Sequence, residues 1–248
     1  MKSDPTAHCP GPRLRRAILL SLVFLLPTLG FAQDAGRPVS CRFLCMEGAT
    51  PPEALLCGAE KGLENVCTVP ANAPSAATVL FAKDNRLKFL TPKDRKLAAT
   101  ATIPATVKSA ILLFIPVAQP QPQPPSWLPW RVFVIDDSAK SFPDGGAFVA
   151  NFYIKNIRFV IGEHKIMLPP GRAHGLTRPE RRDDFNMAQV AFEFQEEQAW
   201  RSVSESLLRF LPGMRYLVFA YVDPASGRPR LFVSTDIKPA FTPPVKSK

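Results

Sequence analysis

Residues 215–222 of this 248-residue chain, Arg-Tyr-Leu-Val-Phe-Ala-Tyr-Val, decide its fold class. Successive side chains of an extended strand point to opposite faces of the sheet. The stretch therefore places apolar side chains on both faces: Tyr216, Val218, Ala220 and Val222 on one, and Leu217, Phe219 and Tyr221 on the other. Two apolar faces predict a central strand that is buried on both sides.

The rest of the chain repeats this kind of segment, with short runs rich in branched and aromatic residues separated by Pro, Gly, Asn or Asp. A period of 3.6 residues, typical of helices, is almost missing, and a helical turn or two is expected only near Pro52–Glu60 and Ser204–Phe210. The runs expected to form the other strands are Val39–Met46, Thr78–Ala82, Arg86–Leu90, Leu97–Thr102, Ala110–Val117, Arg131–Ile135, Ala147–Ile154, Ile157–Ile161, His164–Leu168, Met187–Phe194, Ala199–Leu208 and Arg230–Thr235.

Tight turns join several of these runs into hairpins. Asp84-Asn85, Gly162-Glu163 and the stretch 223–227 supply residues that favour turns, including glycines that tolerate a positive φ. The runs leave little room for the crossover helices that a parallel α/β sheet needs. The sequence therefore predicts an all-β fold, an antiparallel β-sandwich built as one large or two small units, with little helix.

The first 32 residues have the three parts of a cleavable secretory signal peptide. Arg13, Arg15 and Arg16 precede the apolar core Ala17–Leu29, and the small residues Gly30-Phe31-Ala32 follow it. The core is too short to cross a ~30 Å hydrocarbon layer as a mature helix. We therefore expect cleavage near Gln33 and a periplasmic or extracellular bacterial protein with no transmembrane span after processing.

A β-sandwich domain is expected over residues 38–238, with a proline-rich loop at 118–129. That segment, Ala-Gln-Pro-Gln-Pro-Gln-Pro-Pro-Ser-Trp-Leu-Pro, should be extended and unable to join a hydrogen-bonded ladder. The alternative is that it separates two β domains, 38–116 and 130–238. Residues 239–248 show no core pattern and are predicted to be a disordered tail.

Four cysteines follow the leader: Cys41, Cys45, Cys57 and Cys67. An even number in an exported chain suggests disulfides. Cys41 and Cys45 would lie ~13 Å apart in a strand, at ~3.3 Å per residue, too far to pair with each other. If Val39–Met46 folds back on Leu63–Val69, the least strained bridges are Cys41–Cys67 and Cys45–Cys57. Free buried thiols and a zinc site are the alternatives, although the cysteine spacings lack the usual paired zinc-binding pattern.

The block from Arg131 has a distinctive order of turns: a strand ending in Asp136-Asp137-Ser138, then Phe142-Pro143-Asp144-Gly145, a strand through Asn151, and Leu168-Pro169-Pro170-Gly171. In this order and spacing the chain resembles an uncharacterised family of exported bacterial proteins, over roughly residues 130 to 235. The resemblance implies a small β-sandwich-like module and no known activity.

No residue is assigned a catalytic, metal-binding or cofactor-binding role. Asp136 and Asp137 are neighbours at a strand end, where they would point in opposite directions and are better explained as turn caps. His164 and His174 lack the spacing of a metal site, and the sequence contains no Gly-x-Ser-x-Gly motif and no phosphate-binding glycine loop.

Two features suggest binding instead. The loop from Gly171 to Asp184 carries basic side chains that suit an anionic ligand: Arg172, His174, Arg178, Arg181 and Arg182. Interleaved acids offer the alternative of a solvated loop that pairs with itself. Three tryptophans, Trp127, Trp130 and Trp200, could form an aromatic platform for sugars, or pack in the core.

The formal net charge of +10 falls when the basic leader is removed, and the remaining basic residues are scattered. Such a charge favours anionic surfaces and does not indicate a nucleic-acid-binding protein. The sequence predicts a non-catalytic protein of the cell envelope, structural or interaction-mediating, whose partner is an envelope protein or a glycan. A carbohydrate- or anion-binding accessory module is the alternative.

Overall fold

The apolar stretch that begins at Arg215 forms β15 (Met214–Val222), the central strand of its sheet. In the computed structural model, which describes residues 36–58, 64–197, 199–223 and 226–237, residues 215–221 are all buried. One face packs into a cluster with Tyr216, Val218 and Ala220, and the other into a cluster with Leu217, Phe219 and Tyr221. The prediction of a strand buried on both sides is confirmed. The predicted leader at 1–32 and tail at 239–248 lie outside the described residues.

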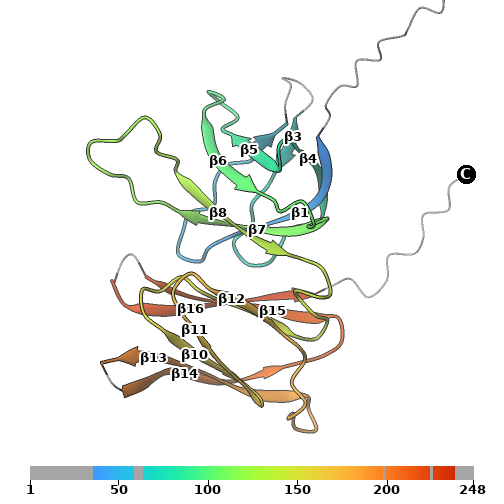
Figure 1. Cartoon of the computed structure of the whole chain (residues 1–248), viewed down its shortest axis with the longest axis vertical. Helices are drawn as coiled ribbons and strands as arrows, with labels where there is room; N and C mark the ends of the chain where they lie inside the picture. The colour runs from blue at the N-terminus through green and yellow to red at the C-terminus, as the bar shows by residue number, and fades with distance from the viewer. Residues whose placement is uncertain (1–35, 59–63, 198, 224–225, 238–248) are drawn as a thin grey trace, which may run out of the picture. The chain divides into compact units, whose positions relative to one another are not determined.

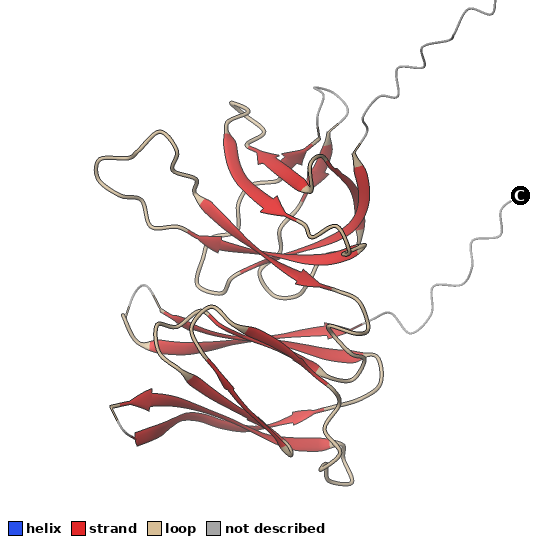
Figure 2. Ribbon diagram, viewed as in Figure 1, coloured by secondary structure: helices blue, strands red, loops and turns tan. Residues whose placement is uncertain are grey.

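Sixteen strands and no helix occur in the part of the chain that the structure describes (Figures 1 and 2). The all-β prediction is therefore confirmed, while the expected helical turns are wrong: residues 55–57 and 199–209 are strands. The strands other than β15 are β1 (Arg37–Cys45), β2 (Leu55–Cys57), β3 (Asn65–Cys67), β4 (Thr78–Ala82), β5 (Arg86–Leu90), β6 (Leu97–Thr102), β7 (Ser109–Pro116), β8 (Trp130–Asp136), β9 (Ala147–Asn151), β10 (Ile157–Ile161), β11 (His164–Leu168), β12 (Ala173–Leu176), β13 (Met187–Glu196), β14 (Ala199–Arg209) and β16 (Pro229–Ile237).

The strands form four sheets of four strands each. Sheet A has the order β4-β1-β7-β8 and sheet B the order β3-β2-β5-β6, and one apolar cluster contains residues of both. Sheet C has the order β12-β9-β15-β16 and sheet D the order β11-β10-β13-β14, and they share a second cluster. A third cluster joins sheet A to sheet C through Leu44, Leu113, Ile135 and Phe219.

Two strand pairs are parallel, β1 with β7 and β9 with β15, and all the others are antiparallel. The chain between the members of each parallel pair consists of further strands rather than of a crossover helix. The sheets are therefore mostly antiparallel, as predicted, with a parallel pair inside sheet A and another inside sheet C.

The predicted pairing of Val39–Met46 with Leu63–Val69 is wrong. β1 lies between β4 and β7, whereas β3 pairs with β2. The reason is length, because β1 extends over nine residues and pairs along both of its edges. A three-residue strand such as β3 cannot cover its length.

The proline-rich segment 118–129 connects β7 to β8, which pair antiparallel with each other in sheet A. A division of the chain at this segment would separate two hydrogen-bonded neighbours. β8 therefore belongs with the strands that precede it, and the sheets C and D are built entirely from residues after 146.

The predicted turns form at two of the hairpins. Asp84 and Asn85 both adopt a positive φ between β4 and β5, and Gly162 does so between β10 and β11. β12 was not predicted as a strand. Its Gly175 explains how it fits, because a Cβ atom at this position would lie 2.0 Å from the carbonyl oxygen of Ser141.

Candidate functional site

A buried cluster of four charged side chains links sheet A to sheet C. At its centre is Arg215, at the start of β15, whose side chain is fully buried. Its guanidinium donates hydrogen bonds to Asp236 of β16, to Asp137 at 2.7 Å and to the carbonyl oxygen of Phe142 at 3.1 Å. The same group lies 3.9 Å from the centroid of the Phe142 ring. The planar guanidinium thus has several partners, as burial of a charge requires.

Arg42 of β1 completes this charge cluster from the other sheet. Its two terminal nitrogens donate to the two oxygens of Asp236 at 3.0 and 2.6 Å, and its Nε donates to the carbonyl oxygen of Ser75 at 3.0 Å. Burial alone would raise the pKa of Asp236, but hydrogen bonds from Arg42 and Arg215 lower it below its ordinary value. Two cations and two anions therefore balance in a cluster that connects the two sheets.

The two adjacent aspartates have different roles. Asp136 caps the turn as predicted: its carboxylate accepts hydrogen bonds from the backbone N–H of Ser138 at 3.0 Å and from the hydroxyl of Ser141 at 2.7 Å. Asp137 points instead to Arg215. The prediction that one of the two aspartates caps the turn is confirmed for Asp136, and the ion pair of Asp137 with Arg215 was not predicted. The sequence does contain a signal for this ion pair: Arg215 lies in an apolar strand, and a buried arginine needs an acid as its partner.

Three hollows lie along β8, and each shares lining residues with the next. Together we call them the β8 groove. The first, of about 420 Å³, lies between β6 and β8 and is lined by Thr100, Thr102 and Val132 to Val134. The second, of about 320 Å³, shares Thr100 and Val132 with the first. The third, of about 560 Å³, shares Val117, Trp130 and Arg131 with the second. Volumes of about 300–1,000 Å³ are typical of ligand sites.

Aromatic side chains line the third hollow, where sheets A and C meet beyond their shared core. Trp130 packs edge-on against Phe114, with ring centroids 6.4 Å apart, and Phe152 packs against Phe133 at 5.0 Å. Burial, followed by the negative charge of Glu47, raises the pKa of Tyr221. The third hollow therefore combines aromatic side chains with three titratable residues, Glu47, Arg131 and Tyr221.

The predicted tryptophan platform forms only in part. Trp127 and Trp130 line the second hollow together with Thr100 and Ser126. Trp200 is elsewhere, on β14 of sheet D, where the guanidinium of Arg158 lies 4.6 Å from its ring.

The arginine-rich segment is folded onto the hairpin at Gly162. The carboxylate of Glu163 accepts hydrogen bonds from the backbone N–H groups of Glu180 at 2.7 Å and Arg181 at 2.9 Å. Burial opposes ionisation of Glu163, but these backbone hydrogen bonds lower its pKa to about 2. The segment is therefore held partly by an acid from outside it, and Ala173–Leu176 within it forms β12.

The five predicted anion-binding side chains differ in exposure. Arg172, His174 and Arg181 are exposed, while Arg178 and Arg182 are half-buried. Arg178 lies over Gly145, where an added Cβ would come within 2.8 Å of its Cδ. Anion binding by this segment stays a prediction. His164, the other histidine of the described residues, lies 3.3 Å from Glu163.

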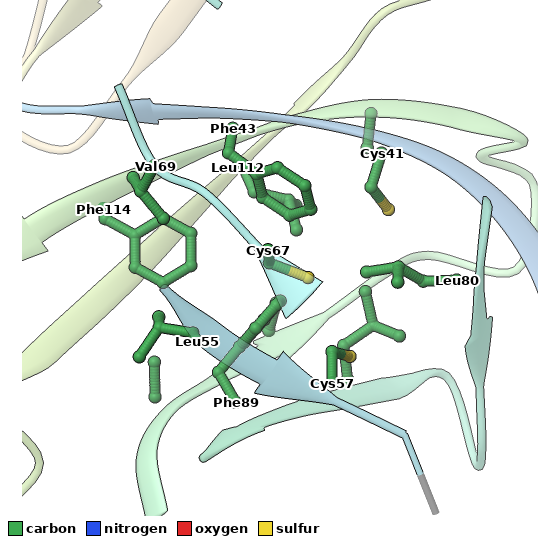
Figure 3. Packing of buried hydrophobic residues seen from close by; sticks show 14 of the residues in the cluster. Cys41, Phe43, Leu55, Cys57, Cys67, Val69, Leu80, Phe89, Leu112 and Phe114 are labelled. Carbon is green, nitrogen blue, oxygen red and sulfur yellow. The ribbon is translucent and has the colours of Figure 1, made fainter. Parts of the chain in front are cut away.

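The four cysteines are buried and their thiols are free, so neither predicted bridge, Cys41–Cys67 or Cys45–Cys57, is present in this structure. Figure 3 shows Cys41, Cys57 and Cys67 among the apolar side chains between sheets A and B. Burial raises the pKa of all three thiols to about 12 and that of Cys45 to about 11. Such thiols are poor nucleophiles and poor metal ligands. Within the described ranges, no group of three or more His, Cys, Asp or Glu side chains could hold a metal ion.

The class defined by these observations is an all-β protein of four sheets with a buried charge cluster and a groove along one strand. No protein-family model matches the sequence, and no curated protein matches it either. Among the residues with a described placement, no helix is long and apolar enough to span a membrane.

Proposed function

We propose that this chain is an exported, non-catalytic binding protein of the bacterial cell envelope, and that it holds its partner in the β8 groove. The β8 groove carries the proposal because aromatic and aliphatic side chains are left partly exposed there beside Glu47 and Arg131. The lining is mainly apolar and aromatic, which favours binding of a ligand over catalysis. The secretory leader pattern of the first 32 residues supports export and a periplasmic or extracellular location.

The charge cluster supports a binding role in a second way. Arg42 and Asp236 tie sheet A to sheet C within the core, and the third hollow lies where the same two sheets diverge. A rigid connection of this kind holds the walls of a site in place, and preorganised sites lose less entropy on binding.

Site-specific photocrosslinking in the native host tests the proposal. A photoreactive residue in place of Thr100, inside the β8 groove, should give discrete adducts in the envelope fraction. The same residue in place of Lys165, an exposed position of β11 in sheet D, is the matched control. Trp130→Ala should weaken the Thr100 adducts. Equal adducts from both positions, or an intact leader on the recovered protein, would count against the proposal.

A glycan is the second candidate for the partner. The specific observation in its favour is that Trp127 and Trp130 line one hollow together with two hydroxyl-bearing residues, Thr100 and Ser126. Calorimetry with soluble fragments of envelope glycans decides between a protein and a glycan as the partner. If sugars stack on the ring of Trp127, Trp127→Ala should abolish glycan binding. Heat signals that are equal in the wild type and the variant would rule out stacking on this ring.

A further inference from the structure

We propose that two copies of this protein associate through the open edge of β14, where the segment Ser204–Arg209 of each copy pairs antiparallel with the same segment of the other. This edge is separate from the β8 groove, and the inference goes beyond the function proposed above. It follows from three properties of β14: its open edge, the direction of its backbone groups and the order of its charges.

The outer edge of β14 is open. β14 ends sheet D (Figure 1), β13 is its only ladder partner in the described part of the chain, and no other described strand runs alongside it. The register with β13 shifts at Val203, so the regular part of the strand begins at Ser204. In this part Glu205, Leu207 and Arg209 are exposed, Leu207 to 57%. An open and partly apolar strand edge is a template for pairing with another chain.

The hydrogen bonds of β13 show where the backbone groups of β14 point. A residue of an antiparallel sheet bonds to only one of its two neighbouring strands. On β13, the carbonyl of Gln189 accepts a hydrogen bond from the N–H of Gly162 at 2.8 Å, on the side of β10. Its partner on β14, Leu207, is therefore not bonded to β13. The N–H and C=O groups of Leu207 point to the open edge, and by alternation so do those of Glu205 and Arg209.

A ladder centred on Leu207 uses these backbone groups. The Leu207 residues of the two copies lie opposite each other and exchange N–H···O bonds, and each Arg209 N–H donates to the Glu205 carbonyl of the other copy. The carbonyl of Arg209 already accepts a hydrogen bond from the hydroxyl of Tyr216 at 2.7 Å, so it stays out of the ladder. Tyr216 thus marks the end of the edge that a second copy can cover.

The charges of this segment complement themselves. In the ladder centred on Leu207, Glu205 of each copy lies opposite Arg209 of the other, and both side chains are exposed. Opposite charges attract at such positions, where Cβ atoms are about 4.5–5.5 Å apart. A ladder centred instead on Glu205 or on Arg209 would bring like charges together. The same surface of both copies meets, as in a closed two-fold dimer, so a second copy is favoured over an unrelated strand.

Exchange of the two charges tests the pairing by sedimentation velocity of the purified protein. Glu205→Arg and Arg209→Glu each bring like charges together in both pairs of the ladder, so either variant should weaken the dimer at least tenfold. In a mixture of the two variants every arginine again faces a glutamate, and the mixed dimer should match the wild type within about threefold. Lys165→Glu is the matched control at the other edge of sheet D and should dimerise as the wild type does.

Three results of this experiment would overturn the inference. The first is a wild type that stays monomeric at about 1 mM, a concentration that reveals even weak association. The second is a dimer that both single variants keep, because its interface would then lie elsewhere. The third is a mixture of the two variants that does not recover the dimer.

Amide hydrogen exchange of the wild type, followed by NMR, tests the ladder without any variant and decides alone if a variant does not fold. Exchange at Leu207 and Arg209 should slow at least tenfold as rising protein concentration drives dimer formation, because their N–H groups enter the ladder. Ser206 and Leu208 bond to β13 in either state, and their exchange should not depend on concentration. Dimer formation that leaves exchange at Leu207 unchanged would remove β14 as the interface.

Discussion

Replacing Asp236 with alanine should be the most damaging single change to the charge cluster. Arg215 is fully buried and Asp236 is 1% exposed, so the variant leaves a positive charge in a region that water does not reach. Removing one partner of a buried pair typically costs about 3–5 kcal/mol. Arg215 keeps Asp137 at 2.7 Å and the Phe142 carbonyl at 3.1 Å, which places the expected loss near the lower end, about 3 kcal/mol.

Urea unfolding of the purified protein measures this loss as a change in the free energy of unfolding. The control is Glu193→Gln, which breaks a pair with Arg158 whose members are 36% and 23% exposed, and should cost under about 1 kcal/mol. If Asp236→Ala lost no more stability than this control, the charge cluster would not hold the sheets together.

The carboxylate of Asp236 should also make the free energy of unfolding depend on pH. Its pKa is lower in the folded protein than in the unfolded chain, so the stabilisation is complete above the unfolded pKa, about 4, and is lost as the pH falls through the folded pKa. The difference in stability between the wild type and Asp236→Asn should therefore be constant from pH 6 to 7 and shrink below about pH 4. A difference that grew on acidification would contradict the assignment.

Three further outcomes are expected. Phe219→Ala should cost about 3–5 kcal/mol in urea melts, because the ring is fully buried at the interface of sheets A and C, and a loss under about 1 kcal/mol would contradict its burial. Asp136→Ala should cost about 1 kcal/mol in urea melts, as the loss of a cap usually does, and an unchanged stability would contradict its capping role. The thiols of Cys41, Cys45, Cys57 and Cys67 should resist iodoacetamide at pH 8 until the reduced protein is denatured, and mass spectrometry of the native protein would show rapid labelling if they are accessible.

The sequence pattern predicted those features that depend on neighbouring residues. The alternation of apolar side chains in Tyr216–Val222 indicates two buried faces, and Asp84-Asn85 indicates a tight turn; both are found. The charge cluster could not be predicted in this way, since Arg42 and Asp236 are 194 residues apart. The approach of β6 to β8 also escapes local analysis, because it depends on which strands end sheets A and B.

The arrangement of β15 and β16 constrains the order in which the protein can assemble. β15 is the inner strand of sheet C and contributes to two cores, and β16 brings Asp236 to an arginine of the first strand. Both strands come from the last quarter of the chain. Contacts between distant parts of a sequence slow folding. A chain that emerges from its N-terminus can form hairpins early, but sheet A gains its ionic partner only when the final strand is released. Truncation before β16 should therefore also disturb β1, because Arg42 would lose its carboxylate partner.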